Sequence, residues 1–87
     1  MTNEEKQLMP QIATDLLTGN YLLYPRSEKQ KELMAEFKMA LWKVTMLRPL
    51  TPREKELIEE AAKAFYGGMP DMCDQLDIPI DYLEHLL

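Results

Sequence analysis

The sequence predicts an all-α fold, a compact bundle of four or five short helices packed around a central helix over residues 27–47. In that stretch, the longest without Gly or Pro, apolar residues recur every three or four positions and so share one helical face. Helix-start signals of the form Ser/Thr-x-x-Glu/Gln stand at Thr2, Ser27 and Thr51. The apolar run at residues 21–24 is short and has no partner strand. We therefore expect residues 1–87 to form a single helical domain.

The first helix has two possible starting points. Thr2 and Glu5 form a capping-box pattern, yet Pro10 interrupts the apolar stripe that follows. A proline inside a helix costs about 3 kcal/mol, whereas one in the first turn is tolerated. The helix therefore either begins at Asn3 and kinks or begins near Pro10. We favour a firm helix from Pro10 to Thr18, with Gly19 as its left-handed stop.

The central helix is expected to begin after Ser27, which with Gln30 forms a second capping box, and to end at Arg48-Pro49. Its apolar stripe predicts the core. The members of the stripe are Leu33, Phe37, Ala40, Leu41, Val44 and Leu47. Met34, Trp42 and Met46 widen the stripe until the second half of the helix is apolar nearly all round. Such a helix is usually buried, so we expect these residues to be covered by other elements.

Three shorter helices are predicted after Pro49. Thr51 and Pro52 give the clearest helix start in the chain, and Gly67-Gly68 gives a stop. A short helix should then run from Pro70 to Leu76, and a last one over residues 80–87.

Composition and charge restrict the class of protein. The chain is 46% hydrophobic and 29% charged, which is ordinary for a globular domain. A single cysteine allows no intramolecular disulfide, and the sequence shows neither a signal peptide nor a membrane span, so we expect a cytoplasmic protein. The charges are unevenly distributed. Residues 1–48 hold seven basic and six acidic side chains, whereas residues 49–87 hold three basic and nine acidic ones.

The C-terminal third is expected to bind a partner. No Lys or Arg follows Lys63, and the acidic surface should attract a basic protein and repel phosphate backbones. The predicted partner-binding residues are Asp71, Asp74, Asp77, Asp81, Glu84 and the neighbouring Tyr82. Their spacing of three and four is typical of a solvated helix face, and it lacks the alternating oxygen ligands around a glycine that a calcium loop needs. We therefore expect no metal site.

Residues 50–87 also suggest an alternative function. The segment opens with Leu50, Thr51, Pro52, Arg53 and Glu54, continues through Cys73-x-x-Leu76-Asp77-Ile78, and ends with Leu83. It resembles the helix-turn-helix of LuxR-type regulators, which implies a DNA-binding transcription regulator. Asp77 stands where that family has its turn glycine, and the segment in the position of the recognition helix has no Lys or Arg. Any DNA contact would instead use Lys29, Lys31, Lys38, Lys43 and Arg48.

Catalysis is not predicted. Cys73 lies on an apolar helix face with no histidine near in sequence, and Ser27 is explained as a cap. Gly67-Gly68 lacks the Lys and Ser/Thr of a phosphate-binding loop. We expect no enzyme and no cofactor, but a regulatory protein that acts by binding another protein. A homodimer through residues 21–24 or through Leu86 and Leu87 is a further possibility.

Overall fold

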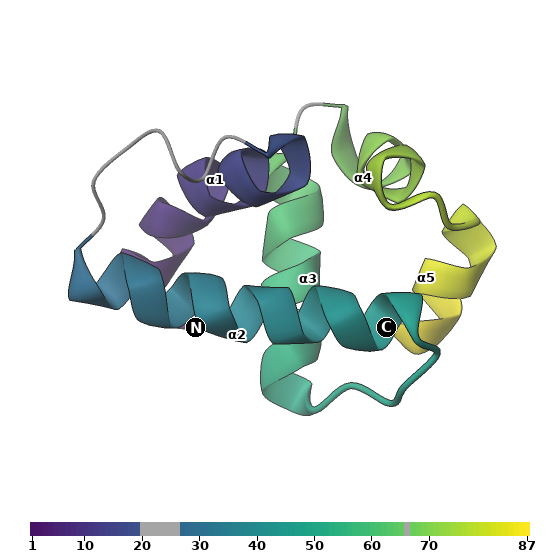
Figure 1. Ribbon diagram of the computed structural model, residues 1–87, viewed down its shortest axis with the longest axis horizontal. Coiled ribbons are helices and arrows are strands. Elements are labelled where there is room, and N and C mark those ends of the chain that lie inside the picture. Colours follow the sequence, from purple (N-terminus) through teal and green to yellow (C-terminus); the bar gives the residue numbers. More distant parts are fainter. Residues whose placement is uncertain (20–26, 66) are drawn as a thin grey trace.

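The computed structural model describes residues 1–19, 27–65 and 67–87, and in these ranges it contains helices and no strand. The five helices are α1 (Asn3–Thr18), α2 (Glu28–Thr45), α3 (Pro52–Ala64), α4 (Gly68–Leu76) and α5 (Ile80–Leu86). They pack into one bundle in which α3 crosses behind α2, with α1 and α4 above and α5 near the C-terminal end of α2 (Figure 1). The predicted all-α bundle is confirmed.

Capping boxes begin the three longest helices. At Thr2, Ser27 and Thr51 the cap side chain accepts the backbone N–H three residues on, and the Glu or Gln side chain at that position accepts the cap N–H in return. Gly19 ends α1 with a φ of 79° in the left-handed region, as predicted. These helix ends are therefore set by local hydrogen bonds that can be read directly from the sequence.

The favoured start of the first helix near Pro10 is wrong. α1 begins at Asn3 and continues through Pro10, which lies exposed in its interior. The missing hydrogen bond at Pro10 is offset by interactions on either side of it: the capping box lies before it, and Met9 and Ile12 are completely buried around it. Tertiary packing outweighs the local penalty.

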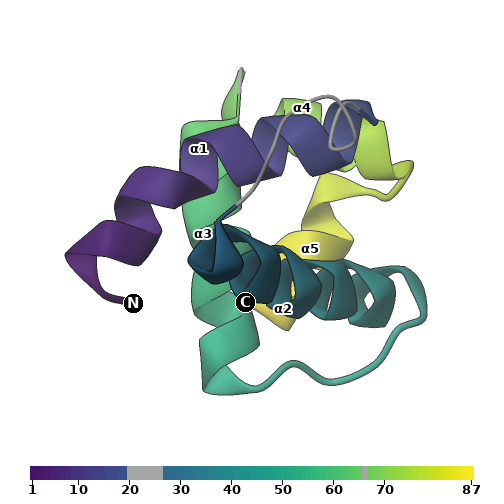
Figure 2. The ribbon, with the colours of Figure 1, turned by 60° about the vertical axis from the view of Figure 1, so that its left-hand side comes forward.

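α3, rather than α2, makes the most extensive contacts with the other helices. α3 packs against α1, α2 and α4, and its inner face is fully buried, whereas α2 packs mainly against α1 and α3. Figure 2 shows α1 passing across one end of α3 while α2 crosses its middle. The core residues of these three helices are Met9, Ile12, Ala13, Leu33, Met34, Phe37, Ala40, Val44, Leu57, Ile58, Ala61 and Ala62.

The expectation that the second half of α2 is buried all round is wrong. Trp42 is 49% exposed, Met46 53% and Leu47 70%. The helix ends at Thr45, earlier than Arg48-Pro49, and Leu47 adopts a left-handed φ of 59° just after it. α2 therefore has one buried face and one apolar face that no other described helix covers.

The last two helices are joined by a tight turn at Asp77. α4 begins at Gly68, two residues before the predicted Pro70. Asp77 has a φ of 57°, so it adopts the left-handed conformation that a glycine would otherwise supply. α5 then returns toward α2, where the hydroxyl of Tyr82 donates a 2.7 Å hydrogen bond to the carbonyl oxygen of Val44. This bond and the buried Leu83 attach α5 to the bundle.

Candidate protein-binding surface

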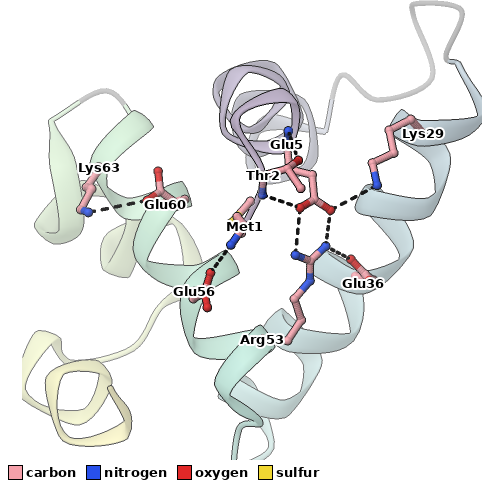
Figure 3. Close-up of polar contacts among 9 residues, drawn as sticks. All are labelled: Met1, Thr2, Glu5, Lys29, Glu36, Arg53, Glu56, Glu60 and Lys63. Carbon is pink, nitrogen blue, oxygen red and sulfur yellow. Dashed lines mark hydrogen bonds and ion pairs between the residues drawn. The ribbon is translucent and has the colours of Figure 1, made fainter.

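A buried carboxylate joins the three longest helices. The side chain of Glu5 on α1 is 4% exposed and accepts hydrogen bonds from both terminal nitrogens of Arg53 on α3. Lys29 on α2 approaches the same carboxylate at 3.3 Å, and Arg53 also donates to Glu36 on α2 (Figure 3). The bonds from Arg53 and from the Thr2 backbone hold the pKa of Glu5 far below its usual range and outweigh its burial.

A second ion pair connects α2 to the start of α3. Lys43 donates to Oε1 of Glu54 at 2.9 Å, and the Thr51 backbone N–H donates to the same oxygen at 2.8 Å. Burial of Glu54 opposes its ionisation, but the bonds from Lys43 and Thr51 together leave its pKa lowered. Both clusters join side chains from different helices, so they help to hold the helices together.

The predicted acidic residues lie at the surface, and several of them border different hollows. Asp74, Asp77, Asp81 and Glu84 are exposed, and Asp71 is half-buried. Asp71 and Asp74 line a shallow hollow that α4 shares with the C-terminal part of α1. Asp74 and Asp77 border another at the α4–α5 turn. Only Glu84 among the five lines the groove described next.

The groove that Glu84 lines is mainly apolar and lies in the C-terminal half of the chain. It has a volume of about 540 Å³ and lies between α3, α4 and the end of α5. Ala62, Gly68, Met69 and Leu87 give it an apolar lining. Its charged lining residues are Glu59, Lys63 and Glu84. Lys63 lies 3.6 Å from Glu60 on its own helix (Figure 3), whereas Glu59 and Glu84 make no ion pair within the described part of the chain.

Tyr82 has a structural contact that the sequence did not reveal. It is half-buried, and its hydroxyl is bonded to the end of α2. The phenol group therefore fixes the position of α5, which carries Glu84, beside the rest of the bundle. Leu86 and Leu87 are half-buried as well, and Leu87 lines the groove. Residues 21–24, the other predicted contact for a homodimer, lie outside the described residues.

Cys73 is buried, at 2% exposed, in the core beside Met72. Its burial and the nearby charges of Asp74 and Glu84 raise the pKa of the thiol, which disfavours the reactive thiolate. Among the described residues, no three His, Cys, Asp or Glu side chains are grouped so that they could hold a metal ion. None of the helices in the same ranges has both the length and the hydropathy that a bilayer crossing requires.

α2 carries an exposed apolar surface that was not predicted from the sequence. Met39, Trp42 and Met46 are about half exposed, and Arg48 lies over the indole ring of Trp42 at 5.9 Å from its centroid. The spacing of these residues was visible in the sequence. The signal was misread because an apolar residue on a helix is assigned to the core by default.

Comparison with known proteins identified no relative of this chain. No family model, no curated protein and no solved structure matches the chain.

Proposed function

We propose that this domain is a protein-binding module that accepts a short basic amphipathic helix in the groove between α3, α4 and α5. The observation that carries the proposal is an apolar lining bordered by two carboxylates, Glu59 and Glu84, that have no ion-pair partner within the described ranges. Leu87 and Met69 supply apolar contact, and methionine adapts its shape to different partners. An apolar helix face would fill the groove while its Lys or Arg residues reach the carboxylates.

The charge distribution supports a basic partner. Asp71 and Asp74 lie on α4 and Asp81 on α5, two of the three helices that line the groove, and Asp77 lies on the turn between them. Together with the absence of Lys and Arg after Lys63, they give this end of the molecule a negative potential. Such a potential raises the association rate of a basic partner more than it raises the final affinity. The groove supplies contact area, and the surrounding acidic residues supply attraction at longer range.

The test uses a synthetic amphipathic helix with Leu on one face and Lys on the other, and a control peptide in which Glu replaces Lys. Titration of the ¹⁵N-labelled domain at low salt should shift the amides of Ala62, Met69 and Leu87 with the basic peptide and leave them unchanged with the acidic one. The variant Glu59→Lys/Glu84→Lys should weaken binding at least tenfold, equivalent to about 1.4 kcal/mol. Glu4→Lys/Glu32→Lys changes the net charge equally at exposed sites elsewhere and should retain most of the affinity.

Two results would count against the groove. One is that both double variants weaken binding equally, which would mean that the loss of affinity comes from the change in net charge alone. The other is that the shifted amides lie outside α3, α4 and α5.

The alternative of a helix-turn-helix DNA-binding regulator predicts a different result. In that arrangement α5 would take the position of the recognition helix, but its exposed polar residues include Asp81 and Glu84, which repel phosphates. Three of the basic residues proposed for DNA contact, Lys29, Lys31 and Lys43, lie in ion pairs with Glu side chains. Random duplex DNA titrated at low salt separates the two functions. A regulator binds with a steep salt dependence, whereas a module for basic helices does not bind.

A further inference from the structure

The face of α2 opposite the core carries a second apolar stripe. Ala35, Met39, Trp42 and Met46 follow one another at intervals of four, three and four residues, and all four are exposed. At roughly 100° of rotation per residue they lie almost opposite the buried stripe that contains Phe37. Figure 1 shows α2 in front of the other helices, with its near side uncovered by any described element. The fold of the single chain buries only one of the two apolar faces of α2.

The stripe contains a hollow and, at its edge, a large aromatic side chain. A hollow of about 450 Å³ is lined by Ala35, Lys38, Met39 and Trp42 and is almost entirely apolar. The small side chain of Ala35 lies at one end of the hollow, and the indole of Trp42 lies at the other. Arg48 lies over the indole ring, at a distance typical of a cation–π contact.

We propose that this stripe is the interface of a homodimer in which two α2 helices pack antiparallel across a two-fold axis close to Met39. Trp42 lies about 4.5 Å beyond Met39 along the helix and Ala35 about 6 Å before it, from the rise of 1.5 Å per residue. The two-fold axis therefore brings Trp42 of each copy over Ala35 of the other. The large side chain enters the hollow twice, and Met39 meets its own copy at the centre. This match of one surface with itself is what an isologous interface requires.

The charges at the two ends of the stripe favour the same antiparallel arrangement. Glu32 lies seven residues before Met39, and Arg48 lies nine residues after it. In the antiparallel pair, Glu32 of one copy approaches Arg48 of the other, whereas a parallel pair would bring like charges together. Lys38 lies near the axis in both copies, where its long stem can carry the ammonium group out to water. The opposite charges at the two ends of the stripe therefore favour a second copy in the antiparallel direction.

The length of the stripe determines how strong the dimer is. From Ala35 to Met46 the helix rises only about 17 Å, so the contact lies at the small end of specific interfaces. The dimer therefore forms at high protein concentration and dissociates on dilution. It uses none of the residues that line the groove between α3, α4 and α5, so it stands independently of the proposed function.

Sedimentation equilibrium on the intact chain tests the proposal, over a concentration range of about 5 μM to 1 mM. The average mass should rise from 10.2 kDa toward twice that value. Trp42 is the only tryptophan in the chain, so its fluorescence reports on the interface directly. Its emission should shift to shorter wavelength, and acrylamide should quench it less, over the same range. Glu84→Lys, a groove variant, should follow the wild-type curve.

An exchange of the large and small residues tests the predicted register. Trp42→Ala removes the side chain that enters the hollow, and Ala35→Trp blocks the end of the hollow at which it enters, so each should raise the dissociation constant at least tenfold. Ala35→Trp/Trp42→Ala exchanges the two positions, and the two-fold axis then places each Trp opposite an Ala again. This double variant should recover the wild-type dissociation constant to within about threefold. Both positions are exposed, and circular dichroism at low concentration checks that the helices are unchanged.

Three outcomes would overturn the proposal. The first is a constant monomer mass at the highest concentration. The second is a dimer whose dissociation constant does not change in the two single variants, or whose wild-type dissociation constant is not recovered in the double variant Ala35→Trp/Trp42→Ala. The third is a blue shift of Trp42 in the dilute monomer on addition of anionic lipid vesicles or duplex DNA without self-association at any concentration, which would assign the stripe to a membrane surface or a nucleic acid.

Discussion

Leu47 occupies a backbone conformation that most side chains avoid. Its φ of 59° lies in the left-handed region, where a Cβ atom crowds the following carbonyl oxygen at a cost of about 1–2 kcal/mol. The position follows the end of α2, and the Arg48 backbone N–H closes the turn on the carbonyl of Lys43. Glycine usually takes this position in such helix ends. The side chain is 70% exposed and contributes little to the core. The strain at Leu47 is therefore not offset by burial.

Leu47→Gly should stabilise the monomer by about 0.5–1 kcal/mol, because glycine enters the left-handed region without steric cost. The measurement is urea unfolding at low protein concentration, where self-association does not contribute. Met46→Gly is the matched control, since Met46 is similarly exposed but has a φ of −98°. This control should be destabilised or unchanged. Equal losses in both variants would show that the left-handed turn imposes no strain.

At the level of the helices, local signals and tertiary packing could be predicted to different extents. The capping boxes at Thr2, Ser27 and Thr51 and the stop at Gly19 were predicted correctly, since each is a hydrogen-bonding or backbone property of a few adjacent residues. The path of α1 through Pro10 was not, because it depends on contacts with α2 and α3. The outer face of α2 was also missed, because periodicity shows that a residue is apolar but not whether another helix covers it.

The two apolar side chains at the centre of α2 differ in burial, and this difference can be measured. Phe37 is completely buried, whereas Leu41 is only partly buried at the edge of the core. Phe37→Ala should therefore cost about 3–5 kcal/mol, through lost burial and the cavity left behind. Leu41→Ala should cost less, about 1–2 kcal/mol, because part of its surface already contacts water.

The loss of unfolding free energy in each variant is obtained from its urea or guanidinium midpoint. The slope of each transition should match that of the wild type, which confirms that the unfolding reaction is the same. Ala35→Gly, at an exposed position of the same helix, gives the cost of helix propensity alone, about 1 kcal/mol. If Leu41→Ala were as costly as Phe37→Ala, the orientation of α2 on the core would have to be different from the one described.

In the whole molecule, the groove could not have been found from the sequence. Of the predicted partner-binding residues only Glu84 lines it, and it is completed by Glu59, Lys63, Met69 and Leu87, which come from three helices. Residues that are 28 positions apart in the chain meet there only because Gly67 and the turn at Asp77 fold α4 and α5 back toward α3. The acidic composition was informative about the charge of the partner. The composition did not indicate where on the surface an apolar groove lies beside these acidic residues.

The buried carboxylate of Glu5 connects this architecture to pH, because it binds α1 to both α2 and α3. Its pKa is far below the ordinary value of 4.5 in the folded state and returns to that value on unfolding. A group with a lowered folded pKa contributes its full stabilisation above the unfolded pKa and loses it as the pH falls toward the folded value. Glu54 acts in the same direction, since its pKa is also lowered.

We therefore expect the free energy of unfolding to be nearly constant from pH 7 down to about pH 5 and to fall steeply below it, because protons bind preferentially to the unfolded chain.

Glu5→Gln removes one of the groups responsible for this acid dependence. The variant should be less stable at pH 7 by about 1.5–3 kcal/mol, the usual loss for a hydrogen bond to a charged group, and its stability should change less between pH 5 and pH 2. Urea titrations at a series of pH values measure both effects. Glu36→Gln, which alters the exposed end of the same network, should change stability by less than about 1 kcal/mol and keep the wild-type pH profile. If Glu5→Gln kept the steep acid dependence of the wild type, the carboxylate that joins the three helices would not be the group that limits the acid stability of the bundle.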